Sequence, residues 1–558
     1  MLDDIPDEEA QKELSMRMIR SALAVAAVFS VIAATARATD LLPADRPIGE
    51  VVDHYVDAVL RRESVKPAAA ADDASMIRRL TLDLAGRIPT AAESRAYAAS
   101  TDPDKRARLI ERLIASPGFG RHQAAELDTM LMAGTKGSLR DYLVKAAGEN
   151  RPWDEIFREL MLPDQTDKLQ KSAAEYLRQR VKDVDRLTAD VSSTFFGVNI
   201  SCAQCHDHPL VKDWKQDHFY GMKSFFNRTF VNGTENAGLL AEHGYGTIRF
   251  KTTEDVEKQA RMMFLTGRRV DDASAAEPSR EEQKKEKEAL DRAKREKVPA
   301  PAPKFSARAK LVELALDPAE REFFARAIVN RVWYRLFGQG LVMPLDQMHS
   351  ANPPSHPELL AWLARDVATH GYDLRRLIRG LVMSEAYART SRWEGGEAPR
   401  PSLFAVALVR PLTATQLATS LRLATADPLS MPNMPPDQLE KRVETAEASA
   451  RSFAASFTNS SGDLQIGVGE ALLFSNGKTI ARELLADGSD RLVGRLKQTV
   501  APAEAIDLAV RNILSRPADD DELHTLATYL AERTDRPDEA RQQLVWALLT
   551  CSEFRFNH

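Results

Sequence analysis

The sequence predicts a mainly α-helical protein with two helical domains and a small β element between them. Apolar residues recur at helical spacing through both halves of the chain, and helix-capping signatures precede several of these stretches. Alternating apolar patterns occur only in one short central region. At 558 residues the chain is long enough for several cores. We expect a helical domain at 45–230, a β element with a charged, proline-rich linker at 231–305, and a helical C-terminal domain at 306–558.

The first 38 residues have the layout of a secretory signal peptide. Arg17 and Arg20 precede an apolar run at 22–34, and Ala36-Arg37-Ala38 provides a cleavage site. We therefore expect an exported protein of the periplasm or cell envelope, which contacts the membrane only if this segment is retained as an anchor. Free thiols oxidise in that compartment, so paired cysteines there indicate a haem, a metal or a disulfide.

Composition narrows the classes of partner. The net charge is −5, and no basic stripe interleaved with aromatic residues occurs. These features exclude nucleic acid as an expected partner, and leave redox or cell-envelope proteins. The sequence contains no Gly-x-Ser-x-Gly, P-loop or dinucleotide-binding fingerprint.

Helical periodicity predicts most of the first domain. Thr90 and Glu93 form a capping box that predicts a helix start, and Ser116-Pro117-Gly118 predicts the end of the helix at 104–114. The helix at 183–196 leads directly into a cysteine-containing stretch. Helices are expected at 48–62, 74–85, from 90, and at 104–114, 139–147, 153–161, 183–196 and 217–226.

The middle of the chain changes character. Residues 244–253 alternate and 262–270 include a short apolar run, which together predict the small β element. The segment 281–297 is almost entirely charged and precedes a proline-alanine run, which predicts a solvated helix followed by a stiff linker.

Capping signals also organise the second domain. Asp317, Pro318 and Glu320 predict a helix start, and Gly338 predicts its end. Ser355 and Glu358 form a second predicted capping box. Further helices are expected from Asp373 to residue 383, and at 413–423, 437–448, 479–485, 503–514, 519–534 and 537–549.

The most informative motif is Cys202-Ala203-Gln204-Cys205-His206. The chain has three cysteines and eleven histidines in total, so chance is a poor explanation for this spacing. In Cys-x-x-Cys-His, two thiols bind the vinyl groups of a c-type haem and the histidine binds its iron. Cys202, Cys205 and His206 are therefore the predicted haem ligands. Met222 and His218 are candidates for the second axial ligand.

Two other interpretations of the same stretch stay open. Imidazole and carboxylate groups in a short segment are typical ligands of zinc or non-haem iron. This candidate metal set consists of His206, Asp207, His208, Asp217 and His218, with Asp213 nearby. Alternatively, Cys202 and Cys205 form a disulfide and the histidines are structural.

Several other residues have simpler structural explanations. The amphipathic spacing of Asn330, Arg331 and Trp333 predicts packing. His349 and His356 flank a proline pair, and a capping-turn role is expected for His356 rather than anion or metal binding. Cys551 is expected to be a buried thiol.

Long stretches of the chain resemble a known pair of domains. Residues 76–90 (MIRRLTLDLAGRIPT) and 197–226, with the cysteine motif, resemble the planctomycete cytochrome-c-associated domain, a family of unknown function. The second half resembles the planctomycete domain of unknown function that usually follows it. The matching phrases lie at 324–333, 337–342, 353–360, 546–549 and 552–554. One departure occurs at 122–132, where the family usually has a tryptophan-rich stretch and this chain keeps Asp128 but no tryptophan.

The resemblance implies an exported protein whose family name refers to a CxxCH signature rather than to an activity. Together with the motif, it leads to the hypothesis of an electron-transfer or haem-dependent oxidation protein. The alternatives are a cell-envelope scaffold with a structural disulfide or metal, and a metal-dependent hydrolase that uses groups from the second domain beside His206 and His208.

Overall fold

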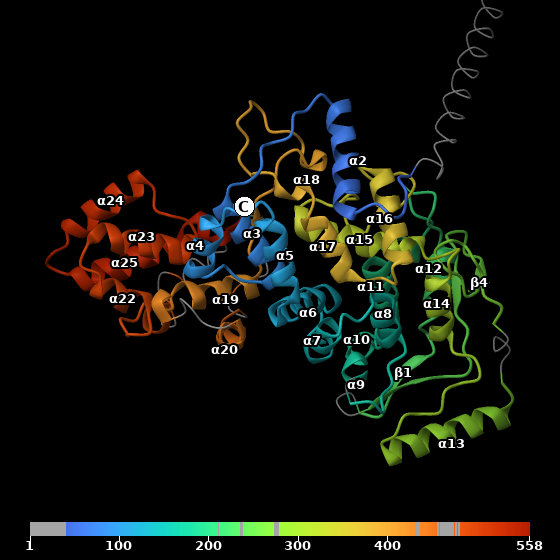
Figure 1. Ribbon diagram of the computed structural model, residues 1–558. Helices are drawn as coiled ribbons and strands as arrows, with labels where there is room; N and C mark the ends of the chain where they lie inside the picture. Colours follow the sequence, from blue (N-terminus) through green and yellow to red (C-terminus); the bar gives the residue numbers. More distant parts are fainter. Residues whose placement is uncertain are drawn as a thin grey trace, which may run out of the picture. The chain divides into compact units, whose positions relative to one another are not determined.

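A computed structural model describes residues 41–168, 170–209, 211–234, 238–272, 278–430, 436–454, 457, 474, 477 and 480–558. The predicted signal peptide lies outside these residues. Within them, helices dominate and each sheet has two strands, which confirms the predicted mainly α fold (Figure 1). No helix of this part of the chain is long and apolar enough to span a bilayer. From Pro47 to His558 the chain forms one compact unit.

The first half is a series of short helices. They are α2 (Ile48–Arg62), α3 (Asp73–Ala85), α4 (Ala91–Ala99), α5 (Lys105–Ala115), α6 (Pro117–Leu131), α7 (Arg140–Gly148), α8 (Trp153–Met161), α9 (Gln170–Ala173), α10 (Glu175–Arg178), α11 (Val184–Phe196), the 3-10 turn η1 (Ser201–Gln204) and α12 (Gln216–Lys223). The central strands are β1 (Thr229–Asn232), β2 (Leu239–Glu242), β3 (Arg249–Lys251) and β4 (Glu257–Gln259), followed by α13 (Arg280–Glu296).

The second half is again helical. Its elements are α14 (Ala307–Leu316), α15 (Glu322–Phe337), α16 (Pro357–Thr369), α17 (Leu374–Val382), α18 (Glu385–Ala388), η2 (Pro401–Leu403), β5 (Arg410–Pro411), α19 (Ala414–Ala424), η3 (Pro428–Ser430), α20 (Pro436–Ala454), η4 (Ile480–Leu484), α22 (Leu492–Gln498), α23 (Pro502–Leu514), α24 (Asp520–Ala531), α25 (Pro537–Thr550), α26 (Ser552–Arg555) and β6 (Phe556–Asn557).

An aromatic cluster joins α8 and α11 to α15. The rings of Trp153 and Phe195 lie 5.5 Å apart, and Phe157 lies 5.0 Å from Phe324. All four side chains are buried, so they contribute both apolar burial and favourable ring geometry. Because α8 and α11 precede the β element while α15 follows it, this core connects the two halves.

Buried polar contacts also cross between the halves. Arg78 on α3 donates to the backbone oxygens of Ile513 and Phe554. Strands β5 and β6 pair antiparallel, and Asn557 on β6 donates to Asp83 on α3. The proposed division into domains at 231–305 stays a prediction.

Several predicted helix boundaries are confirmed. Thr90 and Glu93 form the capping box of α4, Gly338 ends α15 in the left-handed region, and Asp373 caps α17. The charged segment forms α13, which lies beside β1 through a hydrogen bond from Asn232 to the Leu290 carbonyl (Figure 1).

The predicted end of α5 at Ser116-Pro117-Gly118 is confirmed. The same residues also start α6, a helix that was not predicted, because Ser116 accepts a hydrogen bond from the Phe119 amide and proline fits the first turn. Other predictions, about helix starts in the second half, are wrong. The helix predicted from Asp317 starts at Glu322, since Asp317 is the C-cap of α14.

The predicted capping box at Ser355 and Glu358 is also absent from the described contacts. His356 is the N-cap of α16 and makes no side-chain capping bond. In the central region, the described strands lie at β1 to β4, whereas 262–270 contains only an isolated bridge between Met263 and Arg269.

Candidate functional site

The cysteine motif lies just beyond the C-terminus of α11. Gly197 ends this helix with φ +66°, and a Cβ there would approach the Met348 sulfur to 2.8 Å. Only glycine combines that backbone conformation with so close a neighbour at low cost. The chain then passes through Ile200 into the 3-10 turn η1, which carries Cys202.

Both thiols of the motif are accessible. Cys202 and Cys205 are exposed and free in this structure, with the single buried side chain of the turn being Ala203. The alternative in which Cys202 and Cys205 form a disulfide therefore differs from this structure, in which both thiols are free. Two free thiols at this spacing on an exposed turn are in the state that covalent attachment of a cofactor requires.

The imidazole of His206 is oriented by the next residue. His206 Nδ1 lies 2.8 Å from the Asp207 backbone oxygen. A carbonyl oxygen only accepts hydrogen bonds, so Nδ1 carries the proton and the Nε2 lone pair is left for a ligand. A hydrogen bond from the other ring nitrogen to a backbone oxygen is typical of metal-ligating histidines.

Residues of α12 hold the cysteine turn in place through hydrogen bonds. Gln216, which is buried, donates to the backbone oxygens of Cys205 (3.1 Å) and Lys251 (3.3 Å). The backbone amide of Gln216 donates to the Asp207 carboxylate at 3.0 Å. Tyr220 donates to the Gln204 carbonyl and stacks on Phe250. These bonds fix the backbone of the motif while its reactive side chains face outward.

A segment of the second half supports the other side of the turn. The Asn199 amide donates to the Asp346 backbone oxygen at 2.7 Å, and the Asn199 side chain accepts from the Ser201 amide. Further along, Ser350 donates from its amide and hydroxyl to Asp213. The motif is therefore positioned by both halves of the chain.

The remaining predicted metal ligands stabilise the loop after the motif. His208 Nδ1 accepts from the Val211 amide, and His218 Nδ1 accepts from the Lys215 amide. Burial raises the pKa of Asp213, but hydrogen bonds from Ser350 and the nearby His349 outweigh it and lower that pKa. Burial lowers the pKa of both His218 and His349.

These side chains do not converge on one point. Among the described residues, no group of three or more His, Cys, Asp or Glu side chains is placed to hold a metal ion. Asp207 instead caps the start of α12, and Asp217 lies in its first turn. The zinc or iron interpretation, and the hydrolase that depends on it, gain no geometric support.

Neither candidate for the second axial position is presented to the motif. Met222 is completely buried in the core. His218 uses its Nδ1 lone pair for the Lys215 amide, so its Nε2 carries the proton. Both assignments were drawn from sequence distance alone, which carries no information about the direction of a side chain.

The secondary candidates occupy structural positions. Asn330 is buried and exchanges two hydrogen bonds with the backbone of Val342. Trp333 is buried against Phe337. Cys551 is half-buried, and burial raises the pKa of its thiol.

Two further assignments can be refined. Arg331 donates to the carbonyls of Ser193 and Thr194 at the end of α11. His356 is buried at the N-terminus of α16, where burial lowers its pKa to about 4. The imidazole is therefore neutral near pH 7 and unsuited to anion binding.

A second group of chemically active side chains was missed by sequence reasoning. Asp83, His122, Glu126, Arg335 and Arg410 line one pocket, although they belong to four separate segments of the chain. Its only sequence signals were Asp83 within the family-like stretch at 76–90 and the departure at 122–132.

Comparisons with known proteins agree with the resemblance noted in the sequence. Residues 51–230 match a family described as a protein of unknown function (DUF1549), and residues 307–530 match one described as a protein of unknown function (DUF1553). No curated protein matches. No solved structure matches either. The chain belongs to the proteins that carry these two domains of unknown function in this order.

Proposed function

We propose that this chain is an exported haem protein, with a c-type haem attached at the exposed turn that carries Cys202, Cys205 and His206. One observation carries the proposal: His206 donates through Nδ1 to a backbone oxygen beside two free, exposed thiols, which leaves Nε2 as a ligand. The same three side chains are not placed to hold a metal ion, since no group of three or more His, Cys, Asp or Glu side chains among the described residues is.

The residues present fit a covalently held haem. Each thiol would add across one vinyl group, forming a carbon–sulfur bond while its hydrogen passes to the neighbouring carbon. His206 would bind the haem iron through Nε2. A bound haem supplies one-electron redox chemistry.

The protein's own contribution is to position the turn and keep it accessible. Gln216 and Asn199 hold its backbone from two sides, so the thiols and the imidazole keep their relative arrangement. The exposure of Cys202 and Cys205 gives a maturation enzyme and a redox partner protein direct access. Electron transfer with such a partner is the proposed activity.

The test is expression with the native export signal in a host that matures c-type cytochromes. The purified protein should show a pyridine haemochrome spectrum with about one haem per chain. Cys205→Ser should abolish that covalent signal, and Cys551→Ser should preserve it. A colourless wild-type protein whose thiols remain free would contradict the proposal and favour a scaffold protein.

A further inference from the structure

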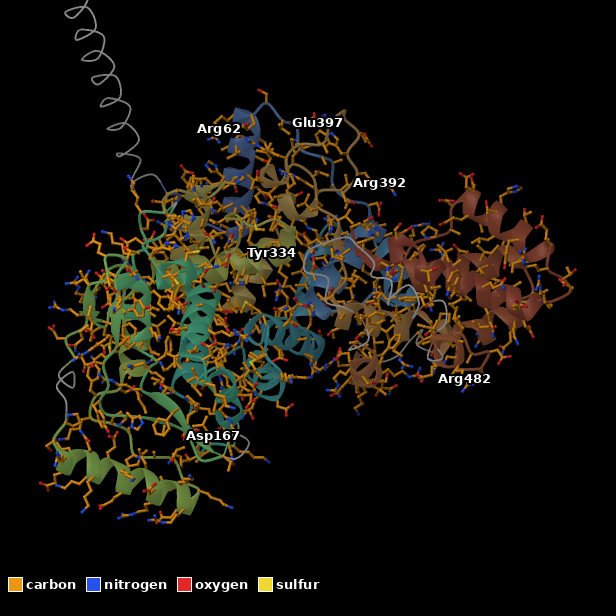
Figure 2. All side chains as sticks on the ribbon, turned by 180° about the vertical axis from the view of Figure 1, so that it is seen from behind. Arg62, Asp167, Tyr334, Arg392, Glu397 and Arg482 are labelled. Carbon is orange, nitrogen blue, oxygen red and sulfur yellow. The ribbon has the colours of Figure 1, made fainter. Side chains whose placement is uncertain are left out.

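The pocket between α3, α6, α15 and the segment at 409–416 has a volume of about 490 Å³. This lies in the range of sites that hold small organic ligands. Tyr334, labelled in Figure 2, contributes to its lining. Apolar side chains form much of the wall, including Leu127, Met130 and Ile328.

One acidic group of the pocket is already neutralised. The Asp83 carboxylate accepts hydrogen bonds from Arg410 and Tyr387, each at 2.7 Å, and from Asn557 at 2.8 Å. Arg410 also donates to the backbone oxygen of Arg335. Asp83 and Arg410 thus form a closed pair that needs no further partner.

Arg335 is in the opposite situation. Its Nε and Nη2 atoms are buried, and no described group accepts a hydrogen bond from them. Burial lowers the pKa of this guanidinium, although Glu126 and Asp83 partly oppose the effect. A buried donor without an acceptor destabilises the fold, and more so when it is charged. The protein alone does not compensate that cost.

The neighbouring groups leave a surplus of positive charge. Three arginines line the pocket (Arg331, Arg335 and Arg410), against two acids. Burial raises the pKa of Glu126, which makes its carboxyl easier to protonate. Burial and Arg335 lower the pKa of His122 to about 3, so this imidazole is neutral near pH 7.

We propose that this pocket binds a small organic acid, whose carboxylate pairs with Arg335 and whose apolar body lies against Leu127, Met130 and Ile328. The planar guanidinium presents parallel N–H donors that match the two oxygens of a carboxylate. The apolar wall favours an organic acid over inorganic phosphate or sulfate, since a bare anion would leave that wall uncovered. The site does not depend on a haem at the cysteine turn.

The proposal is tested by calorimetry and thermal unfolding with benzoate, 2-naphthoate, benzamide and inorganic phosphate. Both acids should bind, and naphthoate should bind more tightly because it buries more apolar surface. The neutral amide and phosphate should bind at least roughly tenfold more weakly. The absence of binding by both acids at about 10 mM, or phosphate binding as tightly as the acids, would overturn the proposal.

Variants separate the site from a structural role. Arg335→Gln should weaken acid binding at least roughly tenfold while leaving the unfolding midpoint unchanged or higher, because it removes an uncompensated buried charge. Arg482→Gln, at an exposed position shown in Figure 2, is the matched control and should change neither property. If Arg335→Gln fails to fold, Met130→Trp tests the same pocket by filling it. Unchanged acid affinity in a folded Arg335→Gln or Met130→Trp protein would refute the site.

Discussion

Two helices of this protein end in the same way but lead to opposite environments. Helix α3 ends at Gly86 with φ +68°, and α11 ends at Gly197 with φ +66°. After Gly86 the chain enters a buried ionic network with Arg87 and Glu93, whereas after Gly197 it forms the exposed cysteine turn. The same left-handed glycine end therefore precedes a buried ion pair after α3 and an exposed, accessible turn after α11.

The difference lies in what the side chains do after each glycine. Around α3, Asp83 is paired with Arg410 and Glu93 with Arg87, so removal of one partner leaves the other uncompensated. Around the cysteine turn, the backbone is held by hydrogen bonds while the side chains make few contacts. We expect substitutions at the first region to cost stability, and those at the second to cost function.

The largest effect is expected at Asp83, on α3. Asp83 is buried, and Asp83→Asn leaves the half-buried Arg410 guanidinium without its charge partner, which should destabilise the fold by about 3 kcal/mol or more. Urea unfolding measures the change. Asp255→Asn is the matched control, because its pair with Lys251 is exposed, and should have no measurable effect. Equal unfolding midpoints for the two variants would contradict the comparison.

Glu93 should give a smaller, pH-dependent effect. Burial raises its pKa, but the charge and hydrogen bonds of Arg87 outweigh it and lower the pKa to about 2. Because this lies below the value of 4.5 for a free carboxyl, the pair stabilises the fold above about pH 4.5 and the contribution is lost as pH falls towards 2. Glu93→Gln should lower the free energy of unfolding by about 3 kcal/mol at pH 7. This difference from wild type should shrink towards zero as the pH falls towards 2.

The measurement for Glu93 is the urea midpoint at several pH values from 7 to 3. Glu397→Gln serves as the control at an exposed position (Figure 2). If wild type and Glu93→Gln show the same pH slope, Arg87 and Glu93 are not coupled as described.

The two helix-ending glycines sharpen the comparison directly. A Cβ on Gly86 would lie 2.6 Å from Nδ1 of the buried His122, whereas one on Gly197 meets the flexible Met348 side chain at 2.8 Å. Gly86→Ala should therefore cost roughly 2–4 kcal/mol, and Gly197→Ala less, because methionine can move aside. Gly371→Ala, with φ +63° and no neighbour within 4 Å, isolates the backbone term of about 1 kcal/mol. In thermal unfolding, the midpoint should fall most for Gly86→Ala, less for Gly197→Ala and least for Gly371→Ala.

The smallest effect on stability is expected at the cysteine turn. Cys202→Ser and Cys205→Ser should each shift the free energy of unfolding of the haem-free protein by no more than about 0.5 kcal/mol, because both side chains are exposed. Denaturant titration of the haem-free protein, purified and unfolded without reductant, provides the measurement. A loss of several kcal/mol would indicate a structural disulfide and would favour the scaffold alternative.

Sequence reasoning was most successful where the physics is local. The capping box of Thr90 and Glu93 and the glycine end of α15 depend on residues within one turn, and both are confirmed. At Pro117 it predicted the end of α5 correctly but missed the start of α6, because one signal both ends a helix and begins the next. A proline that terminates one helix is also favourable in the first turn of another, so the pattern alone does not decide.

The two sites differ in the same respect. The cysteine turn was found because its residues are adjacent in the sequence. The pocket brings Asp83, Glu126, Arg335 and Arg410 together through helix packing, so their proximity depends on the tertiary structure. Direction is equally hidden from sequence: Met222 and His218 lie close to the motif along the chain, but one is buried and the other uses its lone pair elsewhere.

The most direct test of the account is the intact mass of the wild-type protein, denatured after export from a host that matures c-type cytochromes. If the haem centre is present, the protein is a single species heavier than the mature chain by one haem, with only the Cys551 thiol free to react with an alkylating reagent. A species with the mass of the unmodified chain, whether its Cys202 and Cys205 are free or joined in a disulfide, would contradict the proposed haem centre.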